Sequence, residues 1–250
     1  MILTIAAREI RSAFLSPIAW VMIGVIQIIL GFMTAFNLQN YIEVIQPQQH
    51  LLKVPIGVTD IVVVPQYGLL AVMMVFAMPL FTMRVFSDER RNKTLALLVS
   101  APISMTEIVL GKYVGLLFIT IAMLLVYSIM PLSMLSMTNL DFGLLASAII
   151  GIFLFMATCS AIGLYISTLT ANPIIAAILT FFSLLMLWIL SIAKGDTPEE
   201  FSLADLSLFQ HLEAFQRGIF SSSDFLYYVL FTVAFLVLAI RRLDSDRLQH

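Results

Sequence analysis

Charged side chains are scarce in this sequence: Asp, Glu, Lys and Arg make up 11% of its 250 residues, whereas hydrophobic residues make up 61%. Soluble domains typically carry about 25% charged and about 45–50% apolar residues. The chain has too little charge to cover a water-exposed surface, which excludes a cytosolic enzyme, an extended nucleic-acid binder and a disordered tail. The net charge of −2 provides no basic surface for DNA or RNA, so we expect no nucleic-acid partner.

Residues that form disulfides or hold metals are equally scarce. The one cysteine, Cys159, cannot form an internal disulfide, and its apolar surroundings favour a small packing residue. The three histidines, His50, His211 and His250, have no cysteine or carboxylate at the spacing of a metal site. The 14 methionines lack such partners too, which favours packing over copper or haem binding. We therefore expect no metal and no cofactor in this chain.

Motifs for nucleotide binding or nucleophilic catalysis are missing. A G-x-x-x-x-G-K-[ST] loop would need a glycine at position 106, and Thr106 stands there instead, five residues before Gly111. The sequence has no G-x-S-x-G, H-E-x-x-H or G-x-G-x-x-G segment either. No catalytic residue is predicted, and any energy that the protein uses must come from another chain.

Long hydrophobic runs, in contrast, are abundant. A helix needs about 20 mostly apolar residues to cross a bilayer. Six stretches qualify, at residues 18–36, 61–83, 113–135, 144–169, 174–193 and 225–240. The uncharged interval between Asp141 and Lys194 holds two of them, divided at Pro173 because a proline disfavours helix at the preceding residue. We predict an all-α polytopic membrane protein with six transmembrane helices in a single domain, residues 1–250.

Lysine and arginine are unevenly distributed between the loops. With both termini inside, the inner segments carry ten of these residues and the outer segments carry three. Because cytoplasmic loops of membrane proteins are enriched in Lys and Arg, both termini are predicted to be cytoplasmic, with the protein in the inner membrane. The outer loops are short, and the longest, at 194–224, leaves no room for a large receptor domain.

Residues 1–16 are predicted to form an amphipathic helix in the membrane interface. At 100° per residue its side chains form a polar side, with Thr4, Arg8, Arg11 and Ser12, and an apolar side, with Leu3, Ala6, Ile10, Ala13 and Phe14. This helix is either a topology anchor or a lever that couples a cytoplasmic partner to the first span.

The cytoplasmic segment 84–112 between spans two and three has the highest density of charge. Ser87 is expected to cap a short helix, with Asp88 and Glu89 in its first turn, where the helix dipole favours anions. The later turns are rich in leucine and end at Pro102. Exposed leucines need the bilayer interface or a partner protein to cover them.

Two further helix starts are predicted from capping residues. Ser104 and Glu107 form a capping box ahead of the third span. Ser221 and Asp224 can cap the last span, so that helix is expected to extend beyond its apolar part.

Small and polar residues inside the spans suggest contacts between helices. Cys159, Gly163 and Ser167 recur every four residues, which favours close packing within the subunit over a substrate path. Gln27 and Thr34 in the first span either line a translocation path or make one interhelical hydrogen bond each.

The last outer loop contains a second short helical pattern. Residues 209–220 are partly amphipathic, and their polar members His211 and Arg217 are candidates for a gate on the outer face.

Several motifs resemble those of ABC-2 type transporter permeases. They read Glu89-Arg90-x-x-x-Thr94-Leu95-x-Leu97-Leu98-x-x-x-Pro102-Ile-Ser104 with Gly111-Lys112, then Ile162-Gly163-x-x-Ile166-Ser167-x-Leu169-Thr170, and His211-x-x-x-Phe215-x-Arg217-Gly218. The subgroup that the chain most resembles contains the gliding-motility and nitrous-oxide-reductase-maturation permeases. The sequence departs from the family pattern at Asn92-Lys93, where relatives commonly have Ser-Gly, at Ala96 and at Pro173.

The resemblance implies a permease subunit in which segment 84–112 is a coupling helix that docks into a separate ABC ATPase. The implied docking residues are Asp88, Glu89, Arg90, Thr94, Leu95, Leu98 and Pro102. It also implies export, pairing as a homodimer or with a homologous permease, and ATP and Mg bound by the ATPase. The alternative is a non-transporting membrane anchor or assembly scaffold that is also partnered with an ATPase. An intramembrane enzyme is disfavoured because the spans contain no paired ionisable residues.

Overall fold

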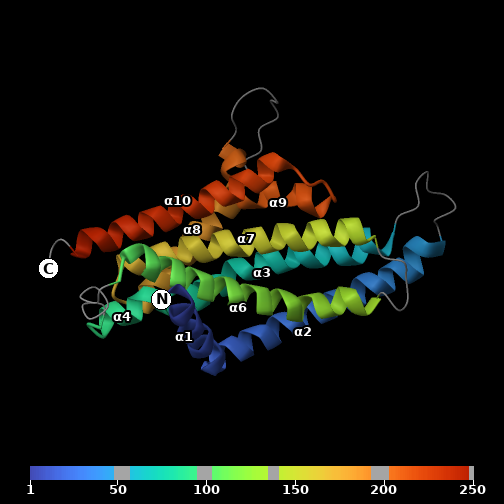
Figure 1. The fold of residues 1–250 in the computed structure, drawn as a ribbon. Helices are drawn as coiled ribbons and strands as arrows, with labels where there is room; N and C mark the ends of the chain where they lie inside the picture. The colour runs from blue at the N-terminus through green and yellow to red at the C-terminus, as the bar shows by residue number, and fades with distance from the viewer. Residues whose placement is uncertain (48–56, 95–102, 135–140, 193–202, 248–250) are drawn as a thin grey trace.

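The computed structural model describes residues 1–47, 57–94, 103–134, 141–192 and 203–247 (Figure 1). Over these ranges the chain consists of helices joined by turns, and no strand occurs in them. The predicted all-α fold class is confirmed.

Six helical segments are long and apolar enough to cross a membrane, as predicted. They are Pro17–Ile45, Thr59–Arg91, Met105–Ser133, Phe142–Leu169, Pro173–Leu190 and Ser222–Arg247. Their main helices are α2 (Pro17–Asn40), α3 (Val64–Thr82), α6 (Met105–Ser133), α7 (Phe142–Leu169), α8 (Pro173–Leu190) and α10 (Ser222–Arg247). Shorter described helices are α1 (Ile2–Leu15), η1 (Tyr41–Ile45), η3 (Thr59–Val63), α4 (Arg84–Arg91), η5 (Leu203–Leu206) and α9 (Leu208–Gln216).

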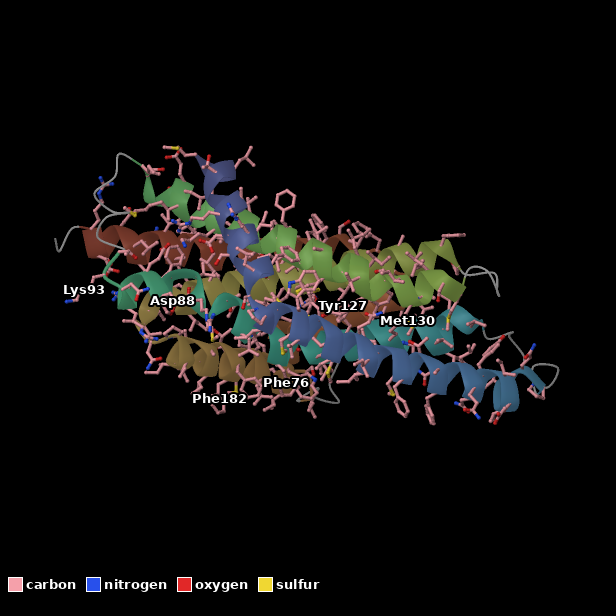
Figure 2. All side chains as sticks on the ribbon, turned by 90° about the horizontal axis from the view of Figure 1, so that it is seen from below. Phe76, Asp88, Lys93, Tyr127, Met130 and Phe182 are labelled. Atoms are coloured by element: carbon pink, nitrogen blue, oxygen red, sulfur yellow. The ribbon has the colours of Figure 1, made fainter. Side chains whose placement is uncertain are left out.

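The helix α7 is the centre of the bundle, since it packs against α3, α6, α8 and α10 along its length and against α9 near its start. Side chains such as Phe76 and Phe182 are exposed on the outer faces of α3 and α8 (Figure 2), as expected of surfaces that contact lipid or another membrane subunit. Both termini, α1 and α4 lie at one end of the bundle, which is called the terminal end below (Figure 1).

The small-residue seam on α7 allows a close crossing with α3 and α4. Cys159, Gly163 and Ser167 are all buried. A Cβ atom at Gly163 would lie 2.1 Å from Thr82 Oγ1, and the Ser87 hydroxyl donates a hydrogen bond to the Ser167 carbonyl over 3.1 Å. The interpretation of this seam as packing within the subunit is confirmed.

The prediction that Ser87 caps a new helix is wrong. The helix α4 follows α3 after the single residue Met83, and the second span runs on to Arg91. Residues 83–91 contain no proline or glycine that would end the helix before Ser87. The Ser87 hydroxyl donates its hydrogen bond to α7, so it does not cap a new helix. The first turn of α4 therefore contains no acidic residue.

The end of α4 explains one departure from the family pattern. The Lys93 N–H donates to the Arg90 carbonyl and the Thr94 N–H to the Glu89 carbonyl, which are the two hydrogen bonds of a Schellman motif. Lys93 has φ 58°, the left-handed conformation that glycine adopts most easily. The chain thus makes the usual glycine turn with a lysine.

Lys93→Gly is expected to stabilise the protein by about 0.5–1 kcal/mol, because it relieves the left-handed strain at some cost in unfolded-state entropy. Thermal unfolding of the detergent-solubilised protein measures the change. Lys93→Ala is the control: it removes the same charge but keeps the Cβ atom, so it should bring no gain. An equal gain in both variants would assign the effect to the charge.

Local capping signals have mixed outcomes. The capping box at Ser104 is confirmed, with the Glu107 N–H donating to Ser104 Oγ and the Ser104 N–H donating to Glu107 Oε2, each over 3.2 Å. At the last span, α10 does extend beyond its apolar part. The Asp224 carboxylate, however, pairs with His211 instead of serving as a capping partner for Ser221.

Candidate functional site

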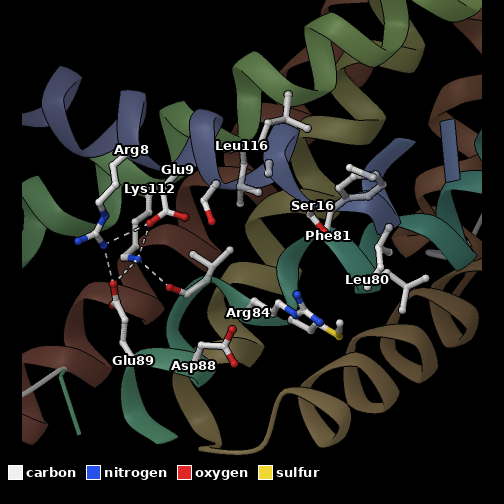
Figure 3. Close-up of a pocket in the computed structure, with 17 residues that line it drawn as sticks. Arg8, Glu9, Ser16, Leu80, Phe81, Arg84, Asp88, Glu89, Lys112 and Leu116 are labelled. Atoms are coloured by element: carbon white, nitrogen blue, oxygen red, sulfur yellow. Dashed lines mark hydrogen bonds and ion pairs between the residues drawn. The ribbon is translucent and has the colours of Figure 1, made fainter. Parts of the chain in front are cut away.

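Four charged side chains form a cluster at the terminal end: Arg8, Glu9, Glu89 and Lys112. The Lys112 side chain is only 1% exposed, and its ammonium nitrogen lies 2.8 Å from Glu9 Oε1, 2.8 Å from Glu89 Oε1 and 2.7 Å from the Val85 carbonyl (Figure 3). A lysine ammonium has three N–H donors, so all of them are used. A charge this deeply buried is stable only when it is paired in this way.

Further contacts complete the terminal charge cluster. Arg8 lies 2.8 Å from Glu89 Oε1 and 3.5 Å from Glu9 Oε1, so the two cations face two carboxylates. The Phe86 ring centroid is 5.0 Å from the Lys112 ammonium, which adds a cation–π contact. The cluster therefore joins three helices: α1 provides Arg8 and Glu9, α4 provides Glu89, and α6 provides Lys112.

Two glycines on α6 bring α1 close enough for these contacts. A Cβ atom at Gly111 would lie 2.9 Å from Ile5 Cβ, and one at Gly115 would lie 2.9 Å from Glu9 Cβ. Since real Cβ atoms do not approach so closely, only glycine at both positions permits this helix separation. The Gly111-Lys112 motif thus supplies both the close contact and the buried cation.

The predicted amphipathic helix exists as α1, and its two sides are largely as predicted: the polar-side residues are exposed, Ala6 is buried, and Ala13 and Phe14 pack against the core. The contact face with α6 contains Ile5, Ala6 and Glu9, whereas Leu3 is 74% exposed. Leu3 is thus an exception on the apolar side, and Glu9 belongs to the contact face because its carboxylate pairs with Lys112 of α6, a partner that the hydrophobic pattern does not show.

A second ion pair joins α4 to the last helix. The Arg90 guanidinium bonds to the Asp246 carboxylate, and Arg242 on the same helix lies 3.6 Å from the other carboxylate oxygen. The Arg90 and Asp246 side chains are 22% and 15% exposed, so this pair is partly shielded from water. The end of α4 is consequently attached to α1, α6 and α10 at once.

The predicted docking residues have different surroundings. Glu89 and Arg90 are engaged in ion pairs within the chain, and Asp88 lines a cavity beside them. Thr94 is exposed, and its hydroxyl donates to the Glu89 carbonyl over 3.3 Å. The other three predicted docking residues, Leu95, Leu98 and Pro102, lie outside the described residues.

The cavity next to the charge cluster has a volume of about 360 Å³ and is called the terminal cavity. Its walls come from α1, the start of α2, the end of α3, α4 and α6. Figure 3 shows the charged side chains of Arg8, Glu89 and Asp88 on one side and the apolar side chains of Leu80 and Phe81 on the other. The cavity thus has a charged half and an apolar half.

Within the spans, the structure pairs one predicted polar residue with a residue that was not predicted. Thr34 Oγ1 lies 3.1 Å from the side-chain amide oxygen of Gln66 on α3, and also 2.7 Å from the Leu30 carbonyl. Gln66 is buried, and its presence inside an apolar span was the available signal. For Gln27, the described residues provide no partner to its buried Oε1 atom. Thr34 therefore makes an interhelical hydrogen bond, whereas a role in a translocation path stays a prediction.

At the opposite side of the bundle, His211 joins α9 to α10. Its Nδ1 lies 2.6 Å from Asp224 Oδ1 and its Nε2 lies 2.9 Å from the Asp205 carbonyl, while its ring stacks on Tyr227 at 3.8 Å. Arg217 is exposed and pairs with Glu213 one turn earlier. The gate role that was predicted for His211 and Arg217 stays a prediction.

The bundle of six apolar spans, with α7 at its centre, defines a multi-pass membrane protein. Residues 57–241 match a family described as ABC-2 family transporter protein, and this range is well over half of the chain. The chain therefore belongs to the ABC-2 transporter family and is a membrane transporter subunit. No curated protein matches the sequence. The matched range includes Glu89, Arg90 and Lys112, and it begins after α1 and α2.

Proposed function

We propose that this chain is the permease subunit of an ATP-driven exporter whose ATPase is a separate polypeptide that docks at the terminal end. The family membership supports a transporter subunit, and the lack of a nucleotide-binding motif supports an external energy source. The excess of Lys and Arg in the segments at the terminal end supports a cytoplasmic location of that end in the inner membrane.

The observation that carries this proposal is that side chains of α4 are bonded to four other helices. Glu89 is held by Lys112 of α6 and Arg8 of α1, Arg90 by Asp246 of α10, and Ser87 by α7. Packed cores and ion pairs change between discrete arrangements and do not deform smoothly. A partner that pushes on the segment after α4 would therefore move four other helices together, which is what a coupling device has to do.

The assembly that we propose contains two permease chains, either identical or homologous, and two ATPase subunits. ATP and Mg would be bound in the ATPase subunits, and closure of those subunits would supply the push. The exposed apolar faces of the spans leave room for a second permease chain within the bilayer.

Leu95→Asp combined with Leu98→Asp is expected to abolish co-purification with the ABC ATPase, because two charges would replace the apolar contacts of the docking segment. The measurement is pull-down of the co-expressed ATPase with the full-length tagged permease. Ile42→Asp with Val44→Asp is the control, since both side chains are exposed and lie in η1, which follows the end of α2 that is remote from the terminal end. An intact complex in the Leu95/Leu98 variant contradicts the docking assignment.

A second measurement separates transport from a membrane anchor or assembly scaffold. In reconstituted vesicles, an exporter should show ATPase stimulation by its substrate, whereas a scaffold should bind the ATPase without any substrate-dependent stimulation. If the complex stayed intact but candidate substrates left the ATPase rate unchanged, the result would contradict the exporter and favour the scaffold.

A further inference from the structure

Two helices that are long and apolar enough to cross a membrane contribute apolar side chains to the wall of the terminal cavity. Ile18 at the start of α2 and Leu80 at the end of α3 line it and are 42% and 37% exposed. Both helices belong to predicted membrane spans, so their exposed apolar side chains face the bilayer. The volume of about 360 Å³ lies within the range of small-ligand sites.

The charged half of the terminal cavity contains groups that have no partner. Figure 3 shows no interaction that reaches Arg84 or Asp88, and among the described residues neither side chain has a hydrogen bond or ion pair. Glu89 uses its Oε1 atom for Arg8 and Lys112, while its Oε2 atom is buried without a partner in the described part of the chain. That oxygen atom is not accessible from the cavity, so the groups that the cavity offers to a ligand are Arg84, which is exposed, and Asp88, which is half-buried.

The charges on the cavity wall add up to a zwitterionic site. Arg8 and Lys112 are neutralised by Glu9 and Glu89. The other two charged groups of the cavity wall are the guanidinium of Arg84 and the carboxylate of Asp88, which lie one helical turn apart on α4. A ligand that matches this pair carries one negative and one positive group close together.

We propose that the terminal cavity binds a phosphatidylethanolamine molecule from the bilayer. The phosphate would accept hydrogen bonds from Arg84, and the ammonium would donate to Asp88. The acyl chains would leave the cavity over Leu80 and Ile18. This site does not depend on the transported substrate, and it assigns Asp88 to the lipid and not to the ATPase docking surface; the lipid would fix α1 against α4 by filling the space between them.

Other headgroups fit this pattern less well. A choline headgroup carries the same charges but has no N–H to donate to the Asp88 carboxylate. A glycerol headgroup is anionic overall and would leave Asp88 without a counter-charge. The selectivity should therefore depend on the number of N–H donors on the lipid nitrogen.

The first experiment uses the unaltered protein and needs no variant. The full-length chain is purified in detergent and delipidated, and lipid binding is followed by native mass spectrometry. The probes are phosphatidylethanolamine, its N-methyl and N,N-dimethyl forms, phosphatidylcholine and phosphatidylglycerol. We expect affinity to fall stepwise with methylation, by about tenfold or more from ethanolamine to choline. Equal binding of all these lipids would overturn the proposal.

The second experiment tests the two residues. Arg84→Gln and Asp88→Asn should each weaken phosphatidylethanolamine binding by about tenfold and flatten the preference over phosphatidylcholine. The matched controls are Arg91→Gln and Asp244→Asn, whose side chains are exposed at the same end and do not line the cavity. If the cavity variants bound phosphatidylethanolamine as tightly as these controls do, the lipid site would have to lie elsewhere.

A soluble competitor distinguishes a lipid site from a general phosphate site. Glycerophosphoethanolamine has the same headgroup without acyl chains, so it should not displace the lipid at equal concentration. Displacement by the soluble compound at that concentration would show that the apolar half contributes nothing and that the ligand is not a lipid.

Discussion

Lys112→Met is expected to lower the free energy of unfolding by about 3 kcal/mol. The substitution keeps the length of the side chain but removes the ammonium that bonds to Glu9 and Glu89. Breaking a buried ion pair by removing one partner costs about 3–5 kcal/mol, because the other charge stays buried without compensation. The lower end applies here because Arg8 stays beside both carboxylates. SDS titration of the protein in mixed micelles measures the loss.

The control and the rescue identify the cause of this loss. Lys93→Met removes the same charge from an exposed side chain at the same end and should leave the stability nearly unchanged. Glu9→Gln and Glu89→Gln, added to Lys112→Met, should recover much of the loss, because the charge that then remains in the cluster is on Arg8, whose side chain is 62% exposed to water. If Lys112→Met unfolded like the unaltered protein, the buried ion pairs could not be what fixes α1 to α4.

The membrane spans could be predicted from the sequence because the bilayer sets their length. A run of about 20 apolar residues is required whatever the neighbouring helices are, so runs such as 144–169 predict a span by themselves. The capping box at Ser104 and Glu107 is equally local, since its partners are three residues apart. Both features were therefore accessible without knowledge of the fold.

The terminal charge cluster could not be predicted, because its partners are far apart in the sequence. Lys112 bonds to Glu9, which is 103 residues away, and the Ser87 hydroxyl bonds to a carbonyl 80 residues away. Residue type alone made Ser87 resemble a helix cap, and the chain carries no local sign of an acceptor on α7. Long-range contacts of this kind decide whether a polar residue caps its own helix or bonds to a neighbouring helix, as Ser87 does.

Gly163→Ala is expected to destabilise the protein by roughly 2–3 kcal/mol, near the upper end of the usual cost of overpacking. The new Cβ atom would lie 2.1 Å from Thr82 Oγ1 and 2.6 Å from Thr82 Cβ, so α3 itself would have to move. Helix propensity alone predicts the opposite sign, because alanine is favoured over glycine in a helix by about 1 kcal/mol. The sign of the change measured by SDS titration therefore decides between packing and propensity.

Gly24→Ala is the matched control, because it makes the same substitution in the membrane helix α2 with nothing within 4 Å of the added atom. It should be neutral or slightly stabilising. Thr82→Gly combined with Gly163→Ala removes the atoms that clash, so the double variant should lose less stability than the sum of the two single variants. Additive losses would show that Thr82 and Gly163 do not meet, and that α3 and α7 cross at a greater distance. A coupled result would instead show that α3 and α7 cross in close contact at Thr82, two residues before α4 begins.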